Sequence, residues 1–314
     1  MGFFIPILTM IAKSVITGIA ISKAISWLAP KPEIPEFQQD TQAQGVLLNK
    51  QSNNANIPVI YGTRKVGGVR VFLETSGTDN QYLYGAIVLC EGEINNITSI
   101  IVNDSPVTFS ASIANGTTIT SNDSKFGTTI QVQPFFGADD QVASSLLTTL
   151  SSWTSDHKLS GICYIAFRIT WDNDKYTGIP NIQAIVQGRK VSTFDGSSNE
   201  TTGQFSTNPA FCLLDYLRNE RFGKGIPLAD IDIPSFFSAS QVAVTQVTPF
   251  SGGSQINLFD CNAVIDTGQK LIDNTRTILK GMRGFLPYTQ GKYKLIIETT
   301  GSSVLTLNED NIIG

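Results

Sequence analysis

Between residues 45 and 192 the apolar positions form short runs, many of which alternate with polar residues, and the runs end at Gly, Pro, Asn, Asp or Ser. The runs are rich in Val, Ile, Tyr and Phe, which is typical of β-strands joined by turns. Strands are expected over 56–62, 68–74, 82–94, 128–136, 161–171 and 181–191, with a hairpin over 98–109. In residues 139–153 the apolar positions recur at helical spacing, so one helix is expected there. The pattern predicts a tube-like β-barrel or sandwich domain over 45–192.

The spacing changes after residues 193–206, a polar, glycine-rich stretch that predicts a loop. Beyond it the sequence predicts three helices and a hairpin, over 208–223, 234–243, 267–284 and 285–298. The first helix has a good N-cap in Asn208 and a proline at its first position, Pro209. Residues 207–314 therefore predict a helix-containing α+β domain that is incomplete at its end. The chain as a whole is expected to be mainly β.

Residues 1–30 are the most apolar part of the chain and predict an N-terminal helix. Lys13 and Lys23 divide the run into pieces shorter than the ~20 apolar residues of a membrane span, and no basic side chain precedes it as in a signal peptide. A helix that is apolar nearly all round has to be covered, so we expect burial in an oligomer or tube, with membrane contact as the alternative. The expected partner-facing residues are Ile5, Leu8, Ile11, Val15, Ile19, Ile25 and Leu28. A proline-rich linker is expected over 31–44.

Charge is sparse in this chain of 314 residues, of which 15% are charged, and the net charge is −4. Globular proteins carry about 25% charged residues, and here Ser, Thr, Asn and Gly take their place, as in extracellular and viral structural proteins. A protein that grips duplex DNA needs a basic face, which short clusters such as Arg64-Lys65 do not provide. The cysteines stand far apart, at Cys90, Cys163, Cys212 and Cys261. Without zinc or redox spacing, they predict buried, reduced thiols.

No group of reactive side chains has the spacing of a catalytic or metal site. Glu91 and Glu93 could face one side of a strand as an acid–base pair, but this spacing is commoner on the polar face of a strand end. Asp172 and Asp174 begin like a calcium loop, but a tyrosine takes the fifth position and the glycine comes one residue late. His157 is the one histidine and has no candidate partner. We therefore expect no enzyme activity, no cofactor and no metal site.

Four blocks of sequence, in order, resemble the amino-terminal hub region of phage tail-tip attachment (host-specificity) proteins of the lambdoid protein J type. The first block is IPVIYGTRKVGGVRVF followed by LYGAIVLCEGEINNITSIIVND. The others are YTGIPNIQAIVQGRKV, NPAFCLLDYLRNERFGKGI, and NTRTILKGMRGFLPYTQGKYKLIIE with the closing NEDNIIG. No block is specific alone, and the strength of the resemblance lies in their shared order. Members of that family continue into receptor-binding parts, so no receptor-binding residue is transferred to this chain.

The resemblance implies a virion structural protein, assembled in the host cytoplasm as a homotrimer that continues and caps the tail tube at the tail tip. The implied partners are the distal tail or tail tube protein, the tape measure protein, and tip and fibre proteins. DNA would pass through without specific binding, and residues 1–30 could touch the host membrane transiently. The stretch beginning at Ile57 would be a hairpin in the ring wall, with Arg64 and Lys65 exposed at its turn as partner-facing residues. Gly67-Gly68 would allow a bulge or a close backbone approach.

Two other functions stay open at the level of the sequence. An envelope-anchored, β-rich surface protein would use residues 1–30 on a membrane. A secreted enzyme that degrades cell-wall glycan would need a cleft with paired carboxylates. The two alternatives differ from a tail hub in the expected state of the purified chain, because neither requires a trimer.

Overall fold

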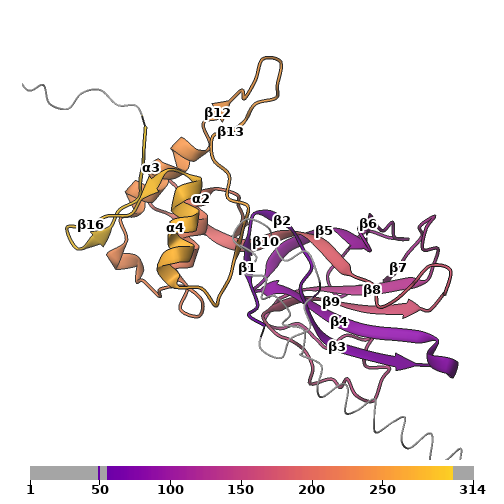
Figure 1. Cartoon of the computed structure of the whole chain (residues 1–314). Helices are drawn as coiled ribbons and strands as arrows, with labels where there is room; N and C mark the ends of the chain where they lie inside the picture. Colours follow the sequence, from indigo (N-terminus) through magenta and orange to yellow (C-terminus); the bar gives the residue numbers. More distant parts are fainter. Residues whose placement is uncertain (1–48, 50–54, 300–314) are drawn as a thin grey trace, which may run out of the picture. The chain divides into compact units, whose positions relative to one another are not determined.

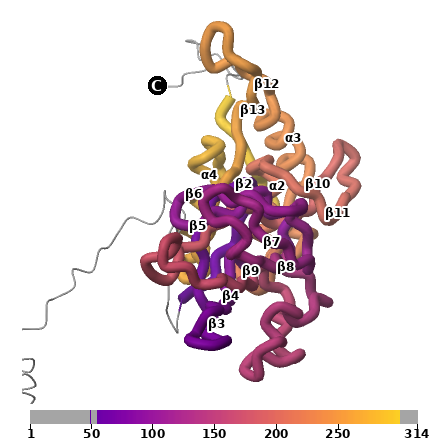
Figure 2. The backbone as a smooth tube through the Cα atoms, turned by 90° about the vertical axis from the view of Figure 1, so that its right-hand side faces the viewer, coloured from indigo at the N-terminus to yellow at the C-terminus, as the bar shows by residue number. Residues whose placement is uncertain are grey.

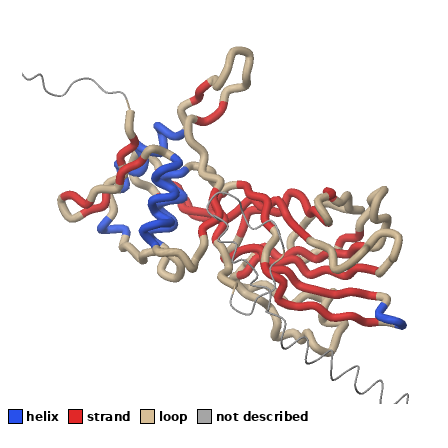
Figure 3. The backbone as a smooth tube through the Cα atoms, viewed as in Figure 1, coloured by secondary structure: helices blue, strands red, loops and turns tan. Residues whose placement is uncertain are grey.

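The computed structural model describes residue 49 and residues 55–299, so the expectations for 1–30, 31–44 and 300–314 lie outside the described residues. Within the described part the fold is mainly β, as the sequence predicts, and the α-helices all follow residue 206; the short blue segment at the end of the β part in Figure 3 is a 3₁₀ helix, Thr78–Asn80. The β part curls into a half-barrel instead of closing into a complete barrel.

Two antiparallel sheets build the β part (Figure 1). One has the order β3-β4-β9-β8-β7, with bounds Val69–Ser76, Tyr82–Glu91, Ile162–Thr170, Ile130–Phe136 and Ile119–Thr120. The other has the order β11-β10-β5-β6, with bounds Glu200–Phe205, Ile182–Phe194, Ile94–Val102 and Ser105–Pro106, and β2 (Thr63–Val66) also pairs with β10. Side chains alternate between the two faces of a strand. The apolar faces of both sheets therefore meet in one core, which includes Ile87 and Phe167 from the first sheet and Ile100 and Val186 from the second.

Residues 139–153, for which the spacing predicts a helix, form a series of turns instead. The segment is rich in Ser and Thr, whose hydroxyls bond to nearby backbone groups; the N–H of Leu147, for example, donates to Ser144 Oγ at 3.3 Å. Such local bonds compete with those of a helix. The apolar residues of the segment still cover the outer face of the first sheet, through Leu147, Leu150 and Trp153.

The stretch 57–72 is not a hairpin, and that expectation is wrong. Its strands pair with three different partners: β1 (Val59–Tyr61) with β14 (Ala263–Ile265), β2 with β10, and β3 with β4. The close backbone approach expected at the glycine pair is confirmed at Gly68, where φ is +70° and a Cβ would lie 2.3 Å from the carbonyl oxygen of Val88. The stretch therefore ties several parts of the molecule together.

Helix α2 (Pro209–Arg218) begins where the sequence predicts. The side chain of Asn208 caps it by accepting a hydrogen bond from the N–H of Ala210 at 3.1 Å. The helix does not continue toward Gly223 as expected. Asn219 has extended backbone angles, and its side chain accepts hydrogen bonds from the N–H groups two and three residues further on, so a side-chain turn ends the helix early.

Helices α3 (Ile233–Ala243) and α4 (Leu271–Gly281) confirm the other two expected helices, and both pack against α2. Strand β15 (Gly284–Phe285) pairs with β18 (Ile296–Ile297), and hairpins join β12 (Gln246–Val247) to β13 (Ile256–Asn257) and β16 (Tyr288–Thr289) to β17 (Lys292–Tyr293). The last one turns at Gln290-Gly291, both at positive φ, as predicted. The β12–β13 hairpin extends away from the helices in both views (Figures 1 and 2).

The stretch 193–206, expected to be a loop, contains the end of β10 and all of β11. These two strands pair from Lys190 with Phe205 to Phe194 with Glu200, around a tight turn at 195–199. Polar, mostly exposed residues thus form a hairpin, because threonine is a good strand former on a solvated face. The division of the chain into 45–192 and 207–314 stays a prediction.

All four cysteines are buried, as expected, and they lie in two neighbouring pairs. Cys90 and Cys163 are opposite each other on β4 and β9. The pKa of Cys163 is raised well above its usual range, mainly by burial and secondly by the neighbouring Cys90 thiol. The pKa of Cys212 is raised in the same way, mainly by the Cys261 thiol and secondly by burial.

We expect the native chain to be inert to a thiol reagent such as DTNB, because the thiolate is the reactive form and burial disfavours it. Denaturation in guanidinium should release all 4 thiols of the chain. Rapid labelling of the native protein, or a Cys90–Cys163 disulfide found by mass spectrometry without reductant, would contradict this expectation.

Candidate functional site

Charged and aromatic side chains meet where strands β1 and β10 contact helix α2. Asp215 is central: Tyr61 Oη donates a hydrogen bond to its Oδ2 at 2.5 Å, and Arg189 Nε donates to the same oxygen at 2.9 Å. The guanidinium of Arg189 also lies 5.2 Å from the ring centre of Phe222. Tyr61 is fully buried, and the side chains of Arg189 and Asp215 are 23% and 14% exposed. Tyr61, Arg189 and Asp215 are called the buried junction below.

Two glycines allow the backbones to come close enough for these contacts. The N–H of Gly188 donates to the carbonyl oxygen of Gly62 at 2.7 Å. A Cβ on Gly188 would lie 2.1 Å from the carbonyl oxygen of Ile60, and a Cβ on Gly62 would lie 2.1 Å from that of Cys261. Neither position has room for a side chain: glycine is required at Gly188 where β10 crosses β1, and at Gly62 where the chain meets the segment that leads into β14.

The electrostatics of the buried junction keep Tyr61 neutral and Arg189 charged. Burial raises the pKa of Tyr61 well above its usual value, and the charge of Asp215 raises it further. Burial alone would lower the pKa of Arg189, but attraction by the carboxylate of Asp215 outweighs it and the pKa is raised. The three groups therefore form a fixed hydrogen-bonded set with one compensated charge pair.

Ion pairs surround the buried junction and link the same elements. Glu91 pairs with Arg221 at 2.5 Å, Glu93 with Lys190 at 2.5 Å, and Glu200 with Arg218 at 2.7 Å. Gly92, with φ +86°, separates the first two carboxylates, and each has its own cation. Glu91 and Glu93 are therefore not arranged as an acid–base pair, and their role here is to hold elements together.

The other candidate residues also have structural contacts. Asp172 Oδ2 accepts from Lys175 Nζ at 2.7 Å, and its Oδ1 accepts from the N–H of Asp174 at 3.0 Å, so the stretch is an Asx turn. The Lys175 contact lowers the pKa of Asp172. Within residues 55–299, no group of three or more His, Cys, Asp or Glu side chains is placed to hold a metal. Among the helices of the described residues, none has the length and apolar character needed to cross a membrane.

Arg64 and Lys65 lie within strand β2 and not at an exposed turn, so their expected position is wrong. They pair with Val186 and Ile185 of β10 across the second sheet. Lys65 Nζ is 3.7 Å from Asp104, and its side chain is 37% exposed. Their part in a partner interface stays a prediction. The apolar residues expected to face a partner, from Ile5 to Leu28, lie outside the described residues.

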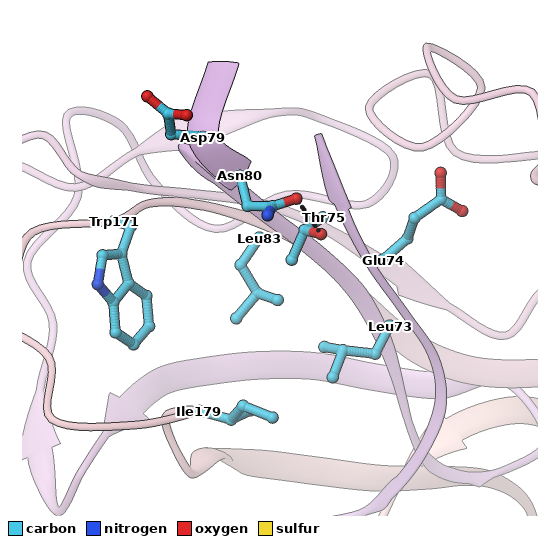
Figure 4. Close-up of a pocket in the computed structure, with 8 residues that line it drawn as sticks. All are labelled: Leu73, Glu74, Thr75, Asp79, Asn80, Leu83, Trp171 and Ile179. Carbon is cyan, nitrogen blue, oxygen red and sulfur yellow. Dashed lines mark hydrogen bonds between the residues drawn. The ribbon is translucent and has the colours of Figure 1, made fainter. Parts of the chain in front are cut away.

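An apolar pocket of about 580 Å³ opens at the β3–β4 end of the β part (Figure 4). Its apolar lining consists of Leu73, Leu83, Trp171 and Ile179, whose side chains surround one hollow in Figure 4. Thr75 Oγ1 bonds to Asn80 Oδ1 at 2.8 Å above them. The carboxylate of Glu74 points away from the hollow and accepts a hydrogen bond from Ser152.

Sequence reasoning missed the buried junction. The pair Arg189-Lys190 has the look of a solvated basic cluster, and nothing in its neighbourhood indicates that Asp215 and Tyr61 converge on Arg189. One signal was present: Asp215 is the one charged residue between Pro209 and Leu217 of a predicted helix that is otherwise apolar, and a carboxylate buried there needs a cation or donor.

Two comparisons with known proteins found similar chains. Over 315 aligned residues the chain is 25% identical to the baseplate hub protein pb3 of Escherichia phage T5, which covers 80% of this chain and 33% of pb3. The chain thus spans about a third of the length of this curated relative. A chain in the virion of a native gene transfer agent particle is similar with a TM-score of 0.45 and 12% identity, over 86% of this chain and 59% of that one. No family model matches the chain.

The similarity to pb3 supports a tail or baseplate hub-type protein of a phage and does not single out the lambdoid protein J type. It supports a virion structural protein as the class of this chain and the phage tail as its location. The similarity therefore supports the resemblance of the sequence blocks to a tail hub. It does not support the narrower assignment to the lambdoid protein J type.

Proposed function

We propose that the chain is a structural component of a phage tail tip: a trimeric hub that continues and caps the tail tube. The hub docks the tape measure protein and the tip and fibre proteins, and it opens for DNA passage. The observation that carries the proposal is the similarity to a baseplate hub protein over 80% of the chain. The role is one of geometry and assembly, and we propose no enzymatic step.

The buried junction fits this role, because a hub has to keep its shape while partners attach on several sides. A fixed set of buried polar bonds specifies how α2 is oriented on β10, which a purely apolar contact would define less sharply. The ion pairs of Glu91, Glu93 and Glu200 connect the same elements. Such pairs contribute little stability when exposed, so orientation is their main effect.

The charge of the chain fits passage of DNA without retention. Tight binding to the DNA backbone needs many Lys and Arg contacts to phosphate. This chain has 22 Lys and Arg against 26 Asp and Glu. A channel wall built from it would not hold DNA.

Native mass spectrometry of the chain, purified from particles or co-expressed with its tail partners, tests the trimer. We expect a species of about three times the chain mass of 34.0 kDa. A monodisperse monomer at micromolar concentration would contradict the trimer. Turnover of cell-wall glycan by the purified chain would contradict the structural role and favour the enzyme alternative.

Deleting residues 1–30 is expected to leave the β fold intact and to block tail completion or DNA delivery. Burying one large apolar side chain is worth about 1.5–3 kcal/mol, so an apolar surface of this size needs a partner. Circular dichroism of the truncated chain checks the fold, and the infectious titre checks the function. The sharper variant is Ile19→Asp, which places a charge among the apolar residues; assembly and infection at wild-type titre would show that this segment is dispensable.

A further inference from the structure

The apolar pocket lies beside an unused strand edge. Strand β3 is the last strand of its sheet, and within residues 55–299 no strand pairs with its outer side. A bulge between Arg70 and Phe72 disturbs the first part of this edge. The remainder, Leu73 to Ser76, has no proline or bulge that would prevent pairing. The edge and the pocket beside it are therefore open to a surface of another molecule, one side chain of which can enter the pocket.

The chemistry of the pocket defines the guest. Its walls are apolar, and Ile179 is 52% exposed although it is a large aliphatic residue. At the rim, Asp79 is exposed and forms no ion pair with any described residue. The guest that fits is an apolar side chain with a positive charge beside it.

A surface that combines exposed apolar side chains with positive charge lies near the C-terminal end of the described residues. From Arg276 to Lys294 the sequence contains basic residues and no acidic one. Within the described part of the chain, Lys280, Arg283 and Lys292 form no ion pair. Next to them are exposed apolar side chains, of which the most informative are Phe285 and Ile296.

Phe285 and Ile296 are directly opposite each other on β15 and β18 and are 59% and 50% exposed. Opposite residues of an antiparallel pair point to the same face. They therefore form one apolar patch bordered by positive charge. An exposed patch of this kind is typical of an interaction surface.

We propose that these two surfaces bind each other between copies of the chain. In the resulting contact, the β15–β18 patch with Arg283 and Lys292 (the donor face) docks on the β3 edge and the pocket (the acceptor face) of the next copy. Because donor and acceptor are different surfaces, the contact is head to tail, and a closing rotation makes a ring. The inference rests on the proposed homotrimer and assigns the surfaces that form it.

Cross-linking tests which surfaces meet. Two single-cysteine variants, Ile179→Cys on the acceptor face and Phe285→Cys on the donor face, are co-expressed with different tags and treated with a short bismaleimide. The native cysteines are buried, so the new thiols react first. We expect covalent dimers from the mixture, dimers and trimers from the double variant, and neither from each single variant alone. As a matched control, Val142→Cys is paired with Phe285→Cys. Val142 is 66% exposed on the turn segment 139–153, and this pair should give no cross-linked dimers or trimers.

Native mass spectrometry of a variant with a new charge on the acceptor face completes the test. Ile179→Lys, at a position that is half exposed so that a lysine can reach solvent, is expected to convert the trimer to monomer, whereas Val142→Lys leaves it intact. If the Ile179→Lys variant remained a trimer, the assignment of the faces would be overturned and the proposed hub would stand. Equal cross-linking through Val142→Cys would have the same consequence. A monomeric wild-type chain would instead overturn the proposed homotrimer, and this contact with it.

Discussion

Gly62→Ala is expected to lower the free energy of unfolding by about 3 kcal/mol or more. Gly62 has φ +68°, and an added Cβ would lie 2.1 Å from the carbonyl oxygen of Cys261. The left-handed backbone costs a residue with a side chain about 1–2 kcal/mol, and overpacking adds about 1–3 kcal/mol. The neighbouring atoms are mostly backbone of the segment leading into β14, which cannot turn aside as a flexible side chain can.

The matched control for this substitution is Gly116→Ala. Gly116 also has φ +68°, but no atom lies within 4 Å of the position of its Cβ, so only the backbone cost of about 1–2 kcal/mol remains. Urea unfolding of both variants measures the difference. Equal destabilisation of the two would show that the backbones at Gly62 are not as close as described, and the approach of β1 to the segment that leads into β14 would have to be revised.

Asp215→Ala is expected to destabilise the chain by about 3 kcal/mol, because it leaves Arg189 buried without its carboxylate. Removing one partner of a buried ion pair costs about 3–5 kcal/mol, and we use the low end since the Arg189 side chain is 23% exposed. Tyr61→Phe removes one hydrogen bond and keeps the ion pair, so it should cost only about 1 kcal/mol.

Asp273→Ala is the control for loss of an aspartate beside an arginine. Asp273 and Arg276 are 3.5 Å apart and 40% and 63% exposed, and such a pair contributes about 0.3–0.5 kcal/mol. Chemical unfolding monitored by circular dichroism compares the three variants. If Asp215→Ala were as mild as Asp273→Ala, the buried junction would not be a determinant of how α2 sits on β10.

Local features of the fold can be predicted from the sequence because their causes are local. The cap of Asn208 on α2 depends on a few consecutive residues, and so does the turn at Gln290-Gly291. The helix expected over 139–153 is absent for the same kind of reason: hydrogen bonds of Ser and Thr with nearby backbone, such as that of Ser144 with the N–H of Leu147, outweigh the apolar spacing.

Strand partners could not be predicted, because pairing is decided between residues far apart in the sequence. Nothing within 57–72 indicates that β1 pairs with β14 or that β2 pairs with β10. The buried junction is non-local in the same way, since Tyr61, Arg189 and Asp215 come from three separate elements. The glycines that admit these contacts, Gly62 and Gly188, are visible in the sequence, but the backbones they accommodate are not.

Cryo-electron microscopy of the virion that contains this chain tests the central claim most directly. The account predicts three copies around the tail axis at the distal end of the tail tube, with the two sheets in the wall and the buried junction resolved as ordered density. Absence of the chain from the tail would contradict a tail hub. So would its repetition in many rings along the tube, because the chain would then be a tube protein instead.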